Sequence, residues 1–180
     1  MKRYTLILVL MISVLLGISG VCWSADFQKG LDAYGKRDYA TALKEWTPLA
    51  KQGHADAQYN LGEMYRYGHG VPWNLETAVK WWTLAAEQGI ASAQYRLGMT
   101  YEGGHYEEVP QDYKTAMKWF TLAAEQGHAS AQYNLGLMYG IGSGVPQDDE
   151  TSMKWFTLAA EQRHADSQSF LGLMYNNGLG

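Results

Sequence analysis

The sequence predicts an all-α fold in which pairs of helices stack into an elongated solenoid. The same residues recur at steps of 36, 38 and 36 positions along the 180-residue chain. Within each period, two stretches carry apolar and small residues at the spacing of a helix face, and glycine-rich turns separate them. A single helix pair could not cover its own apolar face, so neighbouring pairs must cover it.

The period is defined by four sets of aligned residues. A leucine, a glycine and a tyrosine recur in the first half of each unit, and a bulky aromatic residue recurs in the second half. We expect each glycine to let a facing helix approach closely and each aromatic ring to fill the remaining space. The sets are Leu61, Leu97, Leu135 and Leu171; Gly62, Gly98, Gly136 and Gly172; Tyr65, Tyr101, Tyr139 and Tyr175; and Trp46, Trp82, Phe120 and Phe156.

Helix ends can also be placed from the sequence. Gly68 and Gly70 are expected to end the first helix of a unit, and Pro72 to prevent its restart. The second helix then runs as far as Gln88-Gly89. One aligned position supplies the N-cap candidates of the second helices, namely Asp38, Asn74, Asp112 and Asp148.

The N-terminus has the order of a secretory signal peptide. Lys2 and Arg3 precede 18 uncharged residues, 4–21, and small residues follow before the first acid at Asp26. We predict a signal peptide over residues 1–24, cleaved after Ser24, and a periplasmic or secreted bacterial protein without membrane insertion after cleavage. The alternative is an uncleaved membrane anchor, because 18 apolar residues lie near the shortest span of a bilayer.

Composition restricts the partners of the mature chain. The only cysteine of the chain, Cys22, lies in the predicted signal peptide, so the mature chain has no cysteine and packing alone must stabilise the exported protein. Without Lys2 and Arg3, 12 basic side chains remain against 18 acidic ones, a formal charge of −6. Such a balance attracts neither nucleic acid nor an anionic membrane surface.

The recurring pattern resembles the Sel1-like repeat, a relative of the tetratricopeptide repeat with a longer loop between its helices. The matching letters are A-x-A-Q-Y-x-L-G-x-M-Y-x-x-G-x-G-V-P followed by K-W-x-T-L-A-A-E-Q-G. The resemblance divides the mature chain into an N-terminal hairpin at residues 25–54, complete repeats at 55–90, 91–128 and 129–164, and a partial repeat at 165–180. It implies a right-handed superhelix that acts as a scaffold or adaptor for other proteins.

Four Thr-x-x-Lys pairs suggest an alternative function. A hydroxyl one helical turn from an amine resembles the Ser-x-x-Lys of penicillin-recognising enzymes, and some relatives in the Sel1-like family carry a β-lactamase label. No Ser-Asp-Asn or Lys-Thr-Gly accompanies the pairs, which recur in phase with the repeat. We therefore predict no enzyme, and keep a β-lactamase-like hydrolase or penicillin-binding protein as the alternative. The pairs are Thr41–Lys44, Thr77–Lys80, Thr115–Lys118 and Thr151–Lys154.

The histidines do not predict a metal site or a cofactor. His54, His128 and His164 recur in phase and are interpreted as turn residues, since Ile90 takes their place in another unit. His69 and His105 lie in equivalent loops, where we expect them to be solvated, and two histidines alone make a poor metal site.

The predicted binding surface is the concave face, which first helices line in tetratricopeptide-like stacks. We expect a peptide or helix of a protein partner to lie there, because tyrosine and arginine are frequent binding hot spots. The final helix lacks a covering partner, so we also expect self-association through it. The predicted partner-binding residues are Asp56, Tyr59, Asn60, Glu63, Arg66, Tyr95, Arg96, Met99, Glu102, Tyr133, Asn134 and Leu137.

Overall fold

The computed structural model describes residues 25–104 and 108–176, so the predicted signal peptide lies outside the described residues. Within these ranges all regular structure is helical, which confirms the predicted all-α class. The helices are α2 (Phe27–Gly35), α3 (Tyr39–Lys51), α4 (Ala55–Tyr67), α5 (Leu75–Glu87), α6 (Ala91–Gly103), α7 (Tyr113–Glu125), α8 (Ala129–Ile141), α9 (Asp149–Glu161) and α10 (Ala165–Asn176).

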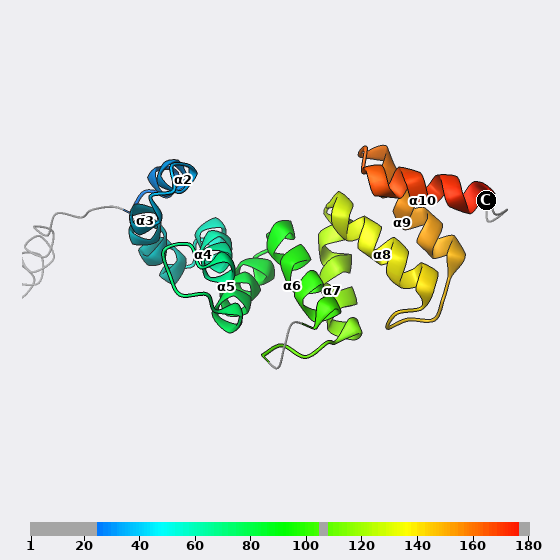
Figure 1. The fold of residues 1–180 in the computed structure, drawn as a ribbon, viewed down its shortest axis with the longest axis horizontal. Coiled ribbons are helices and arrows are strands. Elements are labelled where there is room, and N and C mark those ends of the chain that lie inside the picture. Colours follow the sequence, from blue (N-terminus) through cyan, green and yellow to red (C-terminus); the bar gives the residue numbers. More distant parts are fainter. Residues whose placement is uncertain (1–24, 105–107, 177–180) are drawn as a thin grey trace, which may run out of the picture.

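The helices form an elongated row of hairpins in which each helix packs chiefly on its neighbours in sequence (Figure 1). In this view the hairpins follow one another from the N-terminal end at the left to the C-terminal end at the right, and the row dips at its middle, where α5, α6 and α7 lie. Of the alternate helices, α6 and α8 make the most extensive contact, as expected on the inner side of a curved stack. None of the described helices combines the length and apolarity that a bilayer crossing needs.

The helix ends follow the sequence. Each second helix begins after an acidic or amide cap; Asn74 Oδ1, for example, accepts a hydrogen bond of 2.7 Å from the Thr77 amide. Gly68 ends α4 in the left-handed conformation, at a φ of 68°, which a side chain would strain. The predicted caps Asp38, Asn74, Asp112 and Asp148 are all confirmed.

The recurring glycines and aromatic residues pack against each other, as predicted. Trp82 and Phe120 are buried, and each lies against the glycine of the facing first helix. A Cβ atom added at Gly62 would come within 2.4 Å of the Trp82 ring, and one at Gly98 within 2.4 Å of the Phe120 ring. Only glycine therefore allows the two helices of a hairpin to pack at this separation.

Tryptophans from the second helices join successive hairpins. Trp81, at the start of the second half of α5, packs against the core formed by α2, α3 and α4. Trp119 of α7 is buried in the core that α5 and α6 share. These tryptophans therefore lie between adjacent hairpins and contact both of them.

A ladder of recurring glutamines, most of them buried, also ties the hairpins together and was not predicted from the sequence. Gln94 Nε2 donates to the carbonyl of Ala86, at the open end of α5, over 3.0 Å. Its Oε1 accepts from Gln126 Nε2 of its own hairpin at 2.7 Å. The Ala86 carbonyl also accepts from the turn amide of Gly89 at 3.0 Å, so the glutamine adds a second hydrogen bond to this helix end and links it to the next hairpin. Equivalent bonds to the preceding hairpin are made by Gln58, Gln132 and Gln168.

Candidate protein-binding face

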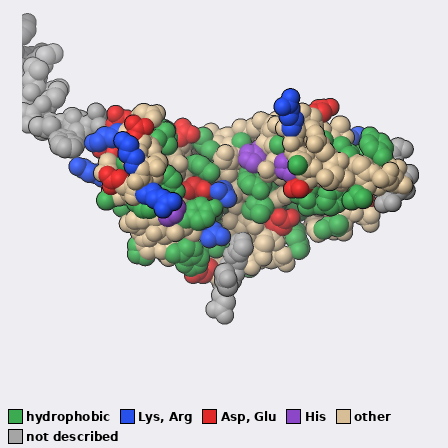
Figure 2. All heavy atoms as spheres, turned by 45° about the horizontal axis from the view of Figure 1, so that its top comes forward, with side chains coloured by type: hydrophobic (Ala, Val, Ile, Leu, Met, Phe, Trp, Pro, Cys, Tyr) green, Lys and Arg blue, Asp and Glu red, His purple; other side chains and the backbone are tan. Residues whose placement is uncertain are grey.

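The first helices α4, α6, α8 and α10 together form one side of the molecule, which we call the first-helix face. Figure 2 shows this side turned toward the reader, with hydrophobic side chains gathered over its middle and far end and charged groups more frequent near the N-terminal hairpin. All twelve predicted partner-binding residues lie on α4, α6 or α8. The structure shows which of them face one another and which remain accessible.

The tyrosines of the face are half-buried and pack on the residue that begins the next first helix. The Tyr95 ring stacks on His128 with 4.6 Å between centroids, and Tyr133 stacks on His164 at 4.9 Å. Tyr59 packs against the apolar cluster that includes Ile90. Desolvation raises the pKa of all three phenols above the ordinary value. These tyrosines therefore stabilise the stack and offer only part of their surface to a partner.

The in-phase histidines are N-caps, a more specific role than the predicted one in the turns. His128 Nδ1 accepts from the Ala131 amide at 3.3 Å, and His54 and His164 do the same for Ala57 and Ser167 at 3.4 Å. Burial lowers the pKa of His128, which agrees with a neutral ring whose Nδ1 is an acceptor. Their place directly before each apolar first-helix stripe was the signal that could have revealed the capping role.

One position on the face carries a contact between adjacent repeats. Arg96 of α6 pairs with Glu63 of α4, with 2.7 Å between Nη2 and Oε2, and their side chains are only 34% and 13% exposed. Burial raises the pKa of Glu63, although Arg96 opposes the shift. Burial alone would lower the pKa of Arg96, but the carboxylate raises it above the ordinary value. Glu63 Oε1 and the Trp82 indole nitrogen nearby are buried without a hydrogen-bond partner among the described residues.

The equivalent contact changes character along the stack. Between α6 and α8, Asn134 Nδ2 lies 3.0 Å from Met99 Sδ. Between α8 and α10, Leu137 and Phe170 line one apolar crevice. Asn134 is only 7% exposed, and its contact with Met99 places the side chain in the junction between repeats, so little of it is accessible to a partner. The contacts between successive first helices thus change from an ion pair at α4–α6 to an apolar crevice at α8–α10.

The accessible part of the face centres on a hollow between α4 and α6. This hollow has a volume of about 110 Å³, and Arg66, Tyr95, Arg96 and Met99 are among its lining residues. The apolar crevice between α8 and α10 is larger, at about 240 Å³. Tyr67 also lines the hollow between α4 and α6, is 49% exposed, and lies under the Arg66 guanidinium at 5.6 Å from the ring centroid. Tyr67 was not among the predicted residues, because it follows the core stripe at the very end of its helix.

The remaining predicted residues lie near this hollow or beyond it. Asp56 is exposed at the start of α4, and Asn60 is half-buried one turn later. Glu102 is half-buried near the end of α6, and desolvation raises its pKa.

His69 does not lie in a solvated loop, which corrects the sequence prediction. Its Nδ1 lies 2.8 Å from the hydroxyl of Tyr34, and its ring stacks on Tyr39 at 4.5 Å. Both tyrosines belong to the N-terminal hairpin, so this contact fastens the α4–α5 loop to the preceding unit. His105 lies outside the described residues.

The Thr-x-x-Lys pairs take part in capping and surface ion pairs. Thr115 Oγ1 donates to the cap residue Asp112 at 2.6 Å, and Thr151 does the same to Asp148 at 2.7 Å. Lys154 pairs with Glu150 at 2.7 Å on the exposed side of α9. Over the described ranges, no three histidine, cysteine or carboxylate side chains gather as metal ligands would.

The fold and this face define a class of protein, the α-helical repeat solenoid. The sequence model described as the Sel1 repeat matches residues 55–90, 91–128, 129–164 and 165–180, more than half of the chain. The chain belongs to the Sel1 repeat family, whose members are generally protein-interaction scaffolds.

Solved structures support the same assignment. A Sel1 repeat protein from Oxalobacter formigenes is 32% identical, with a TM-score of 0.79 over 86% of this chain and 61% of that chain. A protective antigen of uropathogenic Escherichia coli that displays an SLR fold is 36% identical, with a TM-score of 0.79 over 86% of this chain and 34% of the antigen. The chain thus spans about two thirds or less of their lengths. A Neisseria meningitidis protein of uncharacterized role is 53% identical over 34 residues, 19% of this chain and 7% of that protein.

Proposed function

We propose that the protein is an exported, non-enzymatic scaffold that binds a peptide or helix of a partner protein along its first-helix face. The observation that carries the proposal is the difference between repeated and variable positions. Core glycines, aromatic rings and the glutamine ladder recur in each complete unit, whereas the face presents Glu63, Met99 and Leu137 at one equivalent position. Recurring residues serve stacking, so residues that vary on one accessible face are free to serve recognition.

The hollow between α4 and α6 has the chemistry of a protein contact site. Tyr67 and Met99 expose aromatic and apolar surface next to the Arg66 guanidinium. Such side chains give large contact area and hydrogen bonds together, and they are enriched at binding hot spots. At about 110 Å³ the hollow is smaller than cofactor sites, so it suits one side chain of a partner.

A variant in the hollow tests the proposal. We expect Arg66→Glu with Tyr67→Ala to abolish capture of the partner by the purified protein in a crosslinked pulldown from native envelope extract. Leu122→Ala is the matched control, because Leu122 is exposed on α7, a second helix. Retained capture by the hollow variant, or equal loss by the control, would contradict binding at this face.

The hollow variant is preferable to changes at Tyr95 and Arg96. Tyr95 stacks on His128, and Arg96 neutralises the half-buried Glu63. Removing them would weaken the junction between repeats as well as any partner contact. Circular dichroism and thermal unfolding of each variant separate the two effects.

Export is a further part of the proposal and rests on the signal-like order of residues 1–24. We expect the mature protein to begin at Ala25 and to occur in the periplasmic or secreted fraction. N-terminal sequencing of the protein from fractionated cells tests this expectation. An intact N-terminus in the membrane fraction would favour the anchored alternative.

A further inference from the structure

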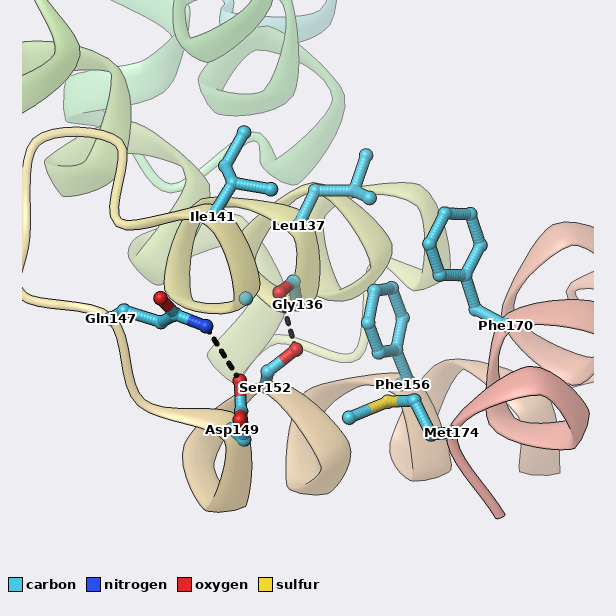
Figure 3. Close-up of a pocket in the computed structure, with 10 residues that line it drawn as sticks. Gly136, Leu137, Ile141, Gln147, Asp149, Ser152, Phe156, Phe170 and Met174 are labelled. Carbon is cyan, nitrogen blue, oxygen red and sulfur yellow. Dashed lines mark hydrogen bonds between the residues drawn. The ribbon is translucent and has the colours of Figure 1, made fainter. Parts of the chain in front are cut away.

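A second crevice lies at the C-terminal end of the first-helix face, between α8, α9 and α10 (Figure 3). We propose that this terminal crevice binds an apolar side chain of a partner peptide whose adjoining residue is lysine or arginine. The inference deepens the proposed scaffold function and rests on it. The crevice is defined by Leu137, Ile141, Asp149, Phe156, Phe170 and Met174.

The terminal crevice is the repeat equivalent of the hollow between α4 and α6. Both are bounded by a first helix, the second helix of the same hairpin and the first helix of the next unit. Four differences distinguish the terminal crevice: two replace a larger side chain by a smaller one, one adds apolar surface and one adds a carboxylate. Arg66, Leu75, Trp82 and Thr100 are replaced at the aligned positions by Gly140, Asp149, Phe156 and Met174.

The volume and walls of the crevice select the size of its occupant. Its volume of about 240 Å³ lies below the ~300 Å³ where cofactor-sized sites begin, so one large side chain suits it. Leu137 and Ile141 line the crevice from α8, Phe156 lines it from α9, and Phe170 approaches from α10 (Figure 3). Ile141 is 72% exposed, which leaves a large apolar side chain in water at the mouth of the crevice.

The charge at one rim of the crevice favours a basic residue next to the apolar residue of the bound peptide. The Asp149 carboxylate lies on this rim and accepts a hydrogen bond from Gln147 Nε2 at 3.1 Å. The adjacent residues Asp148 and Glu150 are also acidic. The nearby Lys154 amine already pairs with Glu150 at 2.7 Å. Beside an apolar crevice, this acidic rim complements a basic side chain and disfavours an acidic one.

Three synthetic peptides test the inference by NMR titration of the isotope-labelled mature protein. They are acetylated, amidated hexapeptides that carry Phe-Lys, Phe-Glu or Ala-Lys between flanking glycines. We expect the Phe-Lys peptide to shift the resonances of Gly140, Ile141 and Met174. We expect the Ala-Lys peptide to bind about tenfold more weakly or worse, because it buries no large side chain. The Phe-Glu peptide should bind about threefold more weakly or worse.

Two variants separate the apolar and charged parts of the crevice. Gly140→Leu should fill the crevice and abolish the peptide-induced shifts. A Cβ atom at this position would lie 3.0 Å from Ser152 Oγ, so the NMR spectrum of the free variant is used to check its fold. Asp149→Asn keeps the shape of the side chain and should remove the preference for Phe-Lys over Phe-Glu. Gly172→Leu is the control, since a Cβ there meets no other atom within 4 Å.

The outcomes distinguish this inference from the proposed function. The Arg66→Glu, Tyr67→Ala variant should still bind the Phe-Lys peptide, because both residues lie in the hollow between α4 and α6 and not in the terminal crevice. Absence of shifts for all three peptides would overturn the terminal crevice while leaving partner capture at α4 and α6 standing. Equal binding of Phe-Lys and Phe-Glu peptides would overturn the basic specificity. Concentration-dependent shifts of Ile141 and Met174 without peptide would instead assign the crevice to a second copy of the chain.

Discussion

The glycine in the middle of each first helix is required by the aromatic ring that faces it. Gly98→Ala places a methyl group 2.4 Å from the Phe120 ring, and we expect the free energy of unfolding to fall by about 1–3 kcal/mol. Gly172 is the aligned residue of α10, and a Cβ atom there meets nothing within 4 Å. Gly172→Ala should therefore leave the free energy of unfolding unchanged or raise it by up to ~1 kcal/mol, because alanine has the higher helix propensity. Urea unfolding measures both variants, and equal effects would contradict the packing role.

His128 gives the stability a dependence on pH. Its folded-state pKa is lowered, chiefly by desolvation, so the unfolded chain binds the proton more readily. The stabilisation from the neutral ring is therefore complete above the unfolded pKa, about 6.5, and is lost as the pH falls toward the folded pKa. We expect the Tm to decrease on acidification, and to decrease less in His128→Asn, which keeps a capping side chain. The same pH profile for both proteins would refute this assignment.

Between elements, the junction of α4 with α6 depends on the pairing of two side chains. Glu63→Met alone leaves the half-buried Arg96 guanidinium without its carboxylate partner. We expect this variant to lower the free energy of unfolding by about 1–3 kcal/mol. Adding Arg96→Asn recreates the methionine–asparagine contact of the next junction, where Asn134 meets Met99. The double variant should recover at least ~0.5 kcal/mol in a double-mutant cycle measured by urea unfolding. Strict additivity of the two changes would contradict the coupling.

The helices and their hairpin packing could be predicted because local patterns encode them. Asp112 precedes its helix as a cap, and Gly98 and Phe120 occupy fixed places in the period, so each role follows from sequence position. The Gln94 ladder, the Glu63–Arg96 pair and the placement of His69 join separate units. These contacts depend on the offset between neighbouring hairpins, which no periodicity within one helix determines. The buried orientation of Asn134 was missed for the same reason.

Across the whole molecule, stability should decrease toward the C-terminal helix. The first and second helices of the complete units pack on both sides, whereas α10 packs on α9 and exposes Leu173 and Tyr175 among the described residues. Stack stability is carried by contacts with neighbours, so amide hydrogens of α10 should exchange faster than those of α6 and α7. Hydrogen exchange at two protein concentrations also tests the proposed self-association, which should protect α10 at the higher one. Protection of α10 equal to that of α6 at low concentration would contradict this account.

The central claim is that recurring residues build the stack and that its first-helix face recognises the partner. Site-specific photo-crosslinking in the native cell tests it most directly, with the photoreactive residue at Met99 on α6 or at Leu122 on α7. The two positions are 38% and 36% exposed, so accessibility is matched and only the side of the molecule differs. We predict a discrete crosslinked product from position 99 and none from position 122. The reverse pattern, or equal products from both, would contradict recognition by the first-helix face.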